Sequence, residues 1–458
     1  MRPVNHRWWA VCAGITGVAL VASLAVILAG PSGRSGDAAA APGSPAFGVL
    51  GSSCEPGRVA ALRRAGVTTV VTEVQWAAAE PAPGAADRGY LAGVRQGLTA
   101  CSSAGLRVVL GLGLQNPPPW VLGLPAATFV DQSGAASTSG EANLVFSAGA
   151  RKAATAYLRD VAGLTGFEDV GAVRLAGELG YPGPEAGASG PSFWAFDAAA
   201  QGGPGLAAGV SPSPMPGWLP GVPVYRGAPV GGEEVARWYD WYTSSLAGSV
   251  VWLAETLRSV GFAGEFHVPL AGRGVLPVDH EQSVATLLDG RADPDGALGR
   301  GLDYPRQFSV FAELDAWLRA QSPPSRVVVD YTGLDDDTAT RTRAETPGEE
   351  TCRSGDSPGS LAAAGLDRGA SQRWTITLAR AARLGVVAEN PGPPERAQTG
   401  GSPFSDGEAD QMVQGARYAR DCGLEAFYLA FEDDLFTPGS GVDVPAYGRV
   451  IAGTGAGR

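Results

Sequence analysis

The chain has 458 residues, a length that fits one large barrel or two to three ordinary domains. Charged residues make up 17%, and the 66 glycines and 35 prolines indicate a compact core with long loops rather than a disordered chain. A net charge of −12 argues against nucleic acid as a partner, and three histidines leave little for a histidine-rich metal site, so we expect no metal and no cofactor.

The N-terminal segment has the pattern of a membrane-targeting element. Residues 1–9 form a short basic tail that we expect to stay in the cytoplasm. Residues 10–30 are uncharged and mostly apolar, and this run is long enough to span a bilayer. Residues 31–45 form a flexible linker or a cleavage region. We therefore expect residues 46–458 to lie outside the cytoplasm, either anchored to the membrane or secreted after cleavage.

Four cysteines lie beyond the apolar segment, and they lack the spacing of a zinc site. An even set in an oxidising compartment predicts disulfides. Of the three possible pairings we predict Cys54–Cys101 and Cys352–Cys422, because each closes a local loop. Buried free thiols are the alternative.

Eight short apolar runs alternate with amphipathic stretches along residues 46–458. The runs are 47–50, 68–74, 107–112, 170–175, 265–270, 327–331, 385–388 and 426–431. Several follow a glycine that ends a predicted helix, as in "RRAGVTTVV", and this arrangement is typical of parallel strands covered by helices. The count of eight favours a (β/α)8 barrel over a doubly wound sheet, since no glycine-rich phosphate loop follows the first strand.

Long connecting segments follow three of the predicted strands. They cover residues 115–146, 180–232 and 332–370, after the third, fourth and sixth strands. Loops of this length are usually functional or disordered. In a barrel all strand-to-helix loops lie at the one end where active sites are found, so we expect the site there.

Acidic residues stand at the C-terminal ends of several predicted strands. They are Glu73, Glu178, Asp330, Glu389 and the run Glu432, Asp433 and Asp434. Carboxyl groups crowded at one barrel mouth can have widely separated pKa values, and one protonated with one ionised carboxyl is the pair that cleaves an acetal. Helix capping or ion pairing is the alternative for an isolated acid at a strand end, and a solvated loop is the alternative for the run 432–434. Glu178 and Glu389 differ from the others because a Gly/Pro-rich turn follows each directly.

Tryptophans also lie in or near the predicted site-side loops. Trp76 follows the second strand, Trp120 the third, and Trp194 and Trp218 the fourth. Their faces can stack on sugar rings, and the alternative is that they build small satellite cores under long loops. We expect Trp76 and Trp120 to contact a ligand.

Two segments resemble the glycoside hydrolase clan that includes the family 42 β-galactosidases. They are "GVTTVVTEVQWAAAEPAPG" and "AGLRVVLGLGLQNPPPWV", followed by a glutamate after the fourth strand. In that clan the acid/base follows strand four and the nucleophile follows strand seven, which are the positions of Glu178 and Glu389. Gly177 stands where that clan usually has asparagine.

The segments "AGELGYP" and "AENPGPP" resemble the family 14 β-amylases more specifically. The resemblance implies that Glu178 is the general acid and Glu389 the general base. The second-strand region is also similar, with Glu73 where β-amylases carry aspartate, but their glycine-rich mobile loop after strand three is missing. Tyr181 and Asn390 lie in the matching segments, and we expect them to contact substrate, as we expect of Asp330.

These observations together predict an extracytoplasmic (β/α)8 glycosidase that acts on an oligo- or polysaccharide, and the Gly-Glu and Glu-Asn contexts favour inversion. A carboxyl separation of about 6.5–9.5 Å would fit inversion and about 5–5.5 Å retention. A glycosyl-transferring enzyme with the same pair would differ only in its acceptor. The rival is a non-catalytic surface barrel that binds glycan or cell-wall partners, with its two glutamates too far apart or its mouth filled by a loop.

Overall fold

The structure is a computed structural model that describes residues 44–175, 177–183, 191–291, 296–365, 369–392 and 407–455. The predicted anchor at residues 10–30 and the basic tail before it lie outside these ranges. Within them, no helix combines the length and the apolar character needed to cross a membrane.

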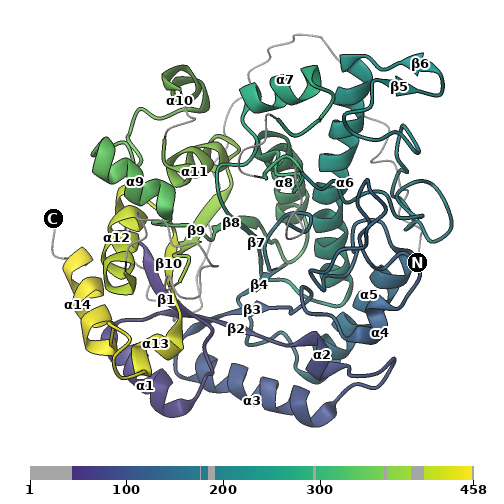
Figure 1. The fold of residues 1–458 in the computed structure, drawn as a ribbon. Coiled ribbons are helices and arrows are strands. Elements are labelled where there is room, and N and C mark those ends of the chain that lie inside the picture. The colour runs from purple at the N-terminus through teal and green to yellow at the C-terminus, as the bar shows by residue number, and fades with distance from the viewer. Residues whose placement is uncertain are drawn as a thin grey trace, which may run out of the picture. The chain divides into compact units, whose positions relative to one another are not determined.

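Eight parallel strands close into a barrel, which Figure 1 shows with the helices arranged around it. The barrel strands are β1 (Ala46–Leu50), β2 (Thr69–Glu73), β3 (Arg107–Gly111), β4 (Ala172–Arg174), β7 (Glu265–Leu270), β8 (Val327–Tyr331), β9 (Gly385–Glu389) and β10 (Ala426–Ala430). They follow one another in chain order around the barrel, and β10 pairs with β1 to close it. All eight predicted strands are thus confirmed, each with its bounds within two residues.

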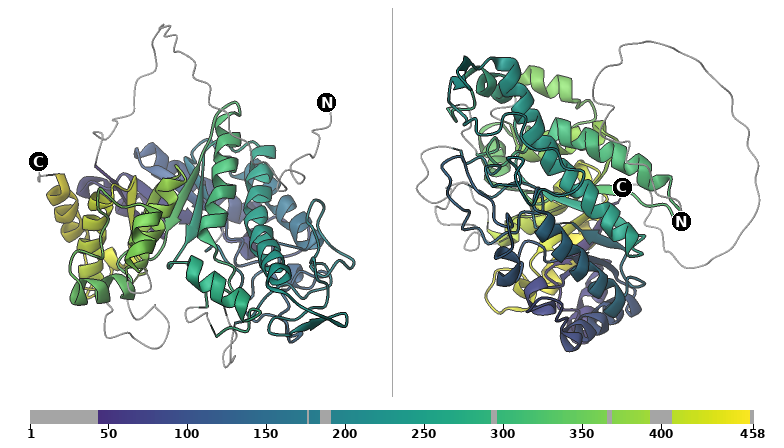
Figure 2. Two further views of the ribbon diagram at one scale, coloured as in Figure 1. Left: turned by 90° about the horizontal axis from the view of Figure 1, so that it is seen from above. Right: turned by 90° about the vertical axis from the view of Figure 1, so that its right-hand side faces the viewer.

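Helices and one small hairpin connect the barrel strands. The helices are α1 (Pro56–Ala65), α2 (Trp76–Ala79), α3 (Arg88–Ser103), α4 (Pro119–Leu122), α5 (Ala148–Leu164), α6 (Gly232–Ser259), α7 (Pro277–Ala285), α8 (Tyr304–Arg319), α9 (Asp337–Glu345), α10 (Pro358–Ala364), α11 (Ser371–Ala381), α12 (Glu408–Asp421), α13 (Glu432–Phe436) and α14 (Val444–Gly455). The antiparallel hairpin of β5 (Val224–Tyr225) and β6 (Ala228–Pro229) follows β4. Figure 2 shows this hairpin and α7 at the same end of the barrel, as expected for strand-to-helix loops.

The first helix illustrates why the sequence places its helix ends where it does. The Glu55 side chain accepts a hydrogen bond from the Arg58 N–H, and Pro56 occupies the first helical position, where no backbone donor is needed. Gly66 ends the helix with φ of +96°, a conformation that costs a residue with a side chain more than it costs glycine. The predicted glycine stop before β2 is confirmed.

Both predicted disulfides are present. Cys54, between β1 and α1, is bonded to Cys101 near the end of α3. Cys352, between α9 and α10, is bonded to Cys422 at the end of α12. Each bridge joins outer segments of the barrel.

At the N-terminal end of the barrel an ionic cluster joins several strands. Arg326 donates hydrogen bonds to Glu265 and Glu425, and Arg107 forms an ion pair of 2.6 Å with Glu265. Burial acts to raise the pKa of Glu265, but His267 and the two arginines outweigh it and lower that pKa to about 2. The carboxylates at this end are matched by cations, which fits a structural role.

Candidate active site

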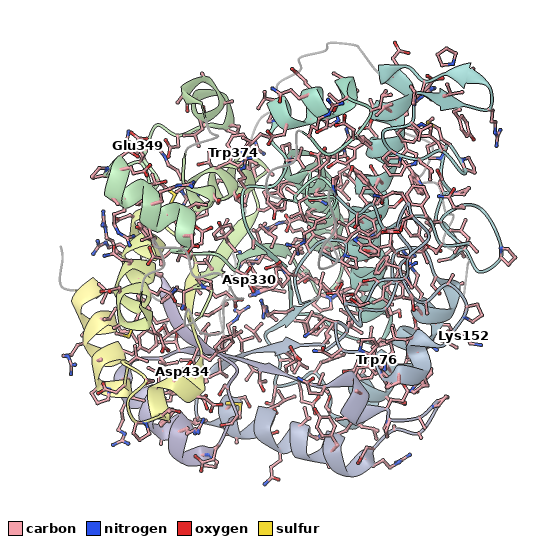
Figure 3. The ribbon with its side chains drawn as sticks, viewed as in Figure 1. Trp76, Lys152, Asp330, Glu349, Trp374 and Asp434 are labelled. Carbon is pink, nitrogen blue, oxygen red and sulfur yellow. A yellow bond between two sulfur atoms is a disulfide. The ribbon has the colours of Figure 1, made fainter. Side chains whose placement is uncertain are left out.

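Side-chain alternation brings four charged residues to the inside of the barrel at its C-terminal end. The interior holds an apolar cluster of Val71, Val109, Ala172, Val328, Val387, Ala426 and Tyr428. Because alternate residues of a strand face the same side, the residues two positions further along face inward as well. On four strands these residues are Glu73, Arg174, Asp330 and Glu389. Figure 3 labels Asp330 near the centre of the barrel.

Arg174 lies between two of these carboxyl groups. Its Nε donates a hydrogen bond of 2.9 Å to Oδ2 of Asp330, and its Nη2 donates one of 3.0 Å to Oε1 of Glu389. The Asp330 side chain is fully buried, and the other two side chains are nearly so. Buried charges are tolerated when they are paired and hydrogen-bonded, and Arg174 supplies that pairing.

Glu389 is the group whose protonation the site alters most clearly. Burial raises its pKa to about 8 against the opposing effect of Arg174, and the charges of Asp330 and Glu178 act in the same direction as burial. Oε2 of Glu389 and Oδ1 of Asp330 have no hydrogen-bond partner among the described residues. Buried acceptors without partners are uncommon in folded proteins, so these two oxygens are candidates to bind a ligand.

Glu178 follows β4 in a segment that is fixed by the next barrel strand. The Leu179 N–H donates to the carbonyl of Pro269 on β7 at 2.7 Å. The Glu178 carboxylate accepts 2.9 Å from Thr332 Oγ1 and 2.8 Å from Arg300 Nη2. With about a third of its side chain exposed, Glu178 is accessible and is held by a cation and a hydroxyl.

Another carboxyl group, that of Glu141, lies close to Glu178 and Arg300. Burial raises the pKa of Glu141, with Arg300 opposing the shift and Glu178 adding to it. Glu141, Gln115 and Glu178 line a small cavity of about 100 Å³ beside α6. The long loop after β3 therefore contributes a titratable group close to Glu178.

Glu178 and Glu389 line one cavity of about 400 Å³ at the C-terminal end of the barrel. Its side chains include Glu73, Gln75, Gln115, Arg174, Thr332 and Phe431. Cavities of this size accommodate small ligands. The charged side chains on its wall and the aromatic ring of Phe431 are the kinds of group that bind a sugar ring through its hydroxyls and its apolar face.

Glu73 lies on the wall of the same cavity and is partly exposed. Its Oε1 accepts 2.6 Å from the Gln75 amide, and its Oε2 accepts 2.9 Å from the Gln115 amide. Two neutral donors thus orient the carboxylate.

The two tryptophans predicted to contact ligand occupy packed positions. Trp76 is fully buried, stacks on Tyr157 with ring centroids 5.1 Å apart, and donates from Nε1 to Glu80. Trp120 is half-buried and donates from Nε1 to the Glu80 carbonyl at 3.1 Å. Neither lines the 400 Å³ cavity. Figure 3 labels Trp76 away from the barrel centre.

Tyr181 and Asn390 also lie outside the cavity lining. Tyr181 is buried, stacks on Tyr242 with centroids 4.1 Å apart, and donates to the Tyr242 carbonyl. The Asn390 amide donates to Gln411 on α12 and its Oδ1 accepts from the Ala430 N–H, so it links β9, β10 and α12. The structure therefore brings together Glu73, Asp330 and the two candidate catalytic glutamates, but not the four residues Trp76, Trp120, Tyr181 and Asn390.

The acidic run after β10 is engaged by the first loop and helix. Glu432 accepts hydrogen bonds from Ser53 and from Arg58, and Asp433 pairs with Arg58 at 2.5 Å. These contacts fit structural ion pairing, and with Glu432 and Asp434 buried the run is not the solvated loop that was the alternative for it.

Several residues of the site were not anticipated from the sequence. The sequence does contain a sign of the role of Arg174, because an arginine inside a buried strand needs carboxylate partners. Phe431 ends the eighth apolar run, and nothing in that run indicates a role in the site. Arg300 and Thr332 carry no local pattern, since only the closed barrel brings them to Glu178.

No protein-family model matches the sequence, and no curated protein matches it either. Solved structures do match. The catalytic domain of a β-amylase from Paenibacillus polymyxa has a TM-score of 0.57 and 16% sequence identity, with 91% of this chain and 100% of that chain covered.

Two β-galactosidases match with a TM-score of 0.53 and 14% identity each. One is from the psychrophilic Marinomonas ef1, with 90% of this chain and 59% of that chain covered. The other is from the Antarctic haloarchaeon Halorubrum lacusprofundi, with 90% and 58% covered. This chain thus spans less than two thirds of either β-galactosidase. At these identities the likeness concerns the fold, and the expected resemblance to both kinds of barrel is confirmed at that level.

Proposed function

We propose that the protein is a glycoside hydrolase that cleaves a glycosidic bond of an oligo- or polysaccharide with Glu178 and Glu389. The observation that carries the proposal is that these two carboxyl groups line one cavity at the barrel end where active sites lie. One of them has its pKa raised to about 8, and the other is paired with Arg300. A protonated and an ionised carboxyl group are what acetal cleavage requires.

The contacts favour a division of roles opposite to the one implied by the β-amylase resemblance. Glu178 accepts hydrogen bonds from the Arg300 guanidinium and the Thr332 hydroxyl, whereas burial favours the neutral form of Glu389. In our proposal Glu389 protonates the leaving oxygen, and Glu178 is the base that activates water or the nucleophile.

The dependence of activity on the leaving group tests which glutamate is the acid and which is the base or nucleophile. A variant without the acid still cleaves aryl glycosides whose leaving group needs no proton, while a variant without the base or nucleophile loses those as well. We expect E389Q to retain activity on a dinitrophenyl glycoside and E178Q to lose it. The opposite result would show that Glu178 is the acid and Glu389 the base, as the β-amylase resemblance implies.

For the stereochemical course we propose inversion, which the Gly-Glu and Glu-Asn segments favour. The test is to follow the anomeric protons of the first product by NMR during hydrolysis of starch, galactan and a panel of aryl glycosides. Inversion predicts that the new reducing end first appears with the anomeric configuration opposite to that of the cleaved bond. Product of the same configuration would indicate a covalent intermediate.

For substrate contact we propose Glu73 and Asp330, supported by the position of Glu73 on the cavity wall and by the unpartnered oxygen of Asp330. The buried positions of Trp76 and Asn390 support packing roles for them. The cavity around the two glutamates supports catalysis over a purely binding barrel, because a filled mouth is one of the features that such a barrel predicts. An acceptor sugar in place of water would make the same pair a transferase.

We further propose that the protein works outside the cytoplasm, anchored by residues 10–30 or released after their cleavage. The two disulfides support this location, because such bonds persist mainly in oxidising compartments. Fractionation of cells that express the full chain, with non-reducing mass spectrometry of the two cysteine pairs, tests it. Reduced protein in the cytosol would contradict the proposal.

A further inference from the structure

The charges around the cavity are not balanced. The carboxyl groups of Glu73, Glu178 and Glu389 line it, and the carboxyl group of Asp330 is bonded to Arg174 on its wall. Arg174 is engaged by Asp330 and Glu389, and Arg300 is engaged by Glu178. Among the described residues no arginine, lysine or histidine forms an ion pair with Glu73. Glu73 is therefore the carboxylate of this cavity that none of those cations contacts directly, although Arg174 acts on it through space.

Neutral donors hold Glu73 in place without neutralising it. The Gln75 and Gln115 amides each donate to one of its oxygens, and both amide residues line the same cavity. An oriented carboxylate on a cavity wall can accept further hydrogen bonds, because each of its oxygens has two lone pairs. Its geometry suits a charged donor arriving from the cavity.

The unfilled hydrogen-bonding capacity of the cavity is also that of an acceptor. Oδ1 of the buried Asp330 lacks a partner among the described residues. Oε2 of Glu389, whose residue is 6% exposed, lacks one too, and it keeps a lone pair for accepting even when it carries the proton. An ammonium group offers three donors and no acceptor, whereas a uronic acid would bring another carboxylate into an acidic cavity. The spare acceptors therefore favour a donor-rich, positively charged ligand.

The charge of the whole chain acts in the same direction. A net charge of −12 attracts a polycation over a long range and repels a polyanion, and this affects how often each reaches the cavity.

We propose that the substrate is a glycan with free, protonated amino groups, and that Glu73 binds one such ammonium group. This inference rests on the proposed glycosidase function and specifies its substrate class. Glu73 is then the residue that distinguishes an amino sugar from its N-acetylated or hydroxyl-bearing counterpart.

The test compares three tetrasaccharide probes that share a β-1,4 backbone: tetraglucosamine, its fully N-acetylated form and cellotetraose. Their affinities are measured by calorimetry in a weakly acidic buffer, in the E178Q background, where turnover is blocked. If E178Q does not fold, the E389Q background replaces it. E73Q keeps the size and hydrogen-bonding capacity of residue 73 but removes its charge. E313Q, on the exposed surface of α8, removes the same charge far from the cavity.

We expect tetraglucosamine to bind about tenfold or more tighter than the other two probes, the difference typical of one charge-assisted hydrogen bond. E73Q should abolish this preference and E313Q should preserve it, and added salt should weaken it. Equal affinities, or a preference that survives E73Q, would overturn the inference.

Product analysis with the unmodified enzyme separates this inference from the proposed function. Cleavage of neutral glycans without a preference for tetraglucosamine would overturn the inference and leave the glycosidase function standing. Preferential binding that E73Q abolishes, without cleavage of any glycan, would support the inference and overturn the function.

Discussion

Arg174 on β4 donates a hydrogen bond of 3.0 Å to Glu389 on β9, although 215 positions separate the two residues in the chain. The same guanidinium group holds Asp330 on β8. One cation thus stabilises two inward carboxyl groups and leaves one oxygen of each without a partner among the described residues. This arrangement couples the stability of the barrel mouth to its chemistry.

Removing this cation should destabilise the fold. R174M would leave Asp330 and Glu389 buried without their partner, and we expect the free energy of unfolding to fall by about 3–5 kcal/mol at neutral pH. R174K should lose less, because it keeps a charge but not the planar fork of donors. Urea unfolding followed by tryptophan fluorescence measures both.

The control for R174M is R291Q, which removes an exposed arginine that pairs with Asp289. It should change stability by no more than about 0.5 kcal/mol. If R174M lowered the free energy of unfolding no more than R291Q does, the ion pairs of Arg174 would contribute nothing to stability.

The stability of the protein should also depend on pH through Glu389. Its pKa is raised to about 8 in the folded state, against about 4.3 in an unfolded chain, so the folded state binds the extra proton between these values. The resulting stability is fully present below about pH 4 and is lost as pH rises through about 8. E389Q cannot ionise, and we expect it to remove a decline on the order of a few kcal/mol between roughly pH 5 and pH 9. Urea unfolding over a pH series tests this, and parallel curves for both proteins would contradict it.

The sequence predicted the strands well because each core strand is a short apolar run between turn signals. The same reasoning predicted the inward carboxyl groups, since Asp330 and Glu389 end apolar runs and a parallel barrel gathers all strand ends at one mouth. Strand alternation could also have identified Arg174 from its place in the fourth run. Contacts between distant loops, such as that of Arg300 with Glu178, depend on the conformation of a long connection and have no counterpart in local pattern.

The orientation of side chains near the barrel mouth could not be predicted from the sequence. Trp76 lies three residues beyond Glu73, the inward-facing last residue of β2, yet its ring stacks on Tyr157 of α5. A sequence reveals that a large ring lies near the mouth, but not whether it points into the cavity or under a helix. Asn390 likewise lies one residue beyond Glu389, and it faces α12 instead of the cavity.

The pH dependence of activity should report which glutamate is the acid. If Glu389 donates the proton, kcat/KM falls as pH rises through about 8, where Glu389 loses it. Measuring kcat/KM across the pH range with a glycan that needs a protonated leaving group tests this. Activity that instead rises up to about pH 8 would indicate that ionised Glu389 is the base or nucleophile.

The two disulfides should make stability sensitive to reductant. The Cys54–Cys101 bridge spans 47 positions, and bridges of this length typically stabilise the fold by about 2–5 kcal/mol. We expect the C54A/C101A double variant to lower the free energy of unfolding by that amount. Dithiothreitol can reduce both disulfides of the wild-type protein, so its free energy of unfolding should then be equal to or lower than that of the variant, which lacks one. A variant as stable as the oxidised wild type would contradict the expected stabilisation.

The most direct test of the account is the turnover number of E178Q and E389Q on the glycan that the unmodified enzyme cleaves best. We expect each substitution to lower kcat by about 10²-fold or more while thermal unfolding remains cooperative, and we expect E313Q to retain wild-type kcat. Wild-type turnover in either E178Q or E389Q would show that the pair in this cavity does not carry the reaction.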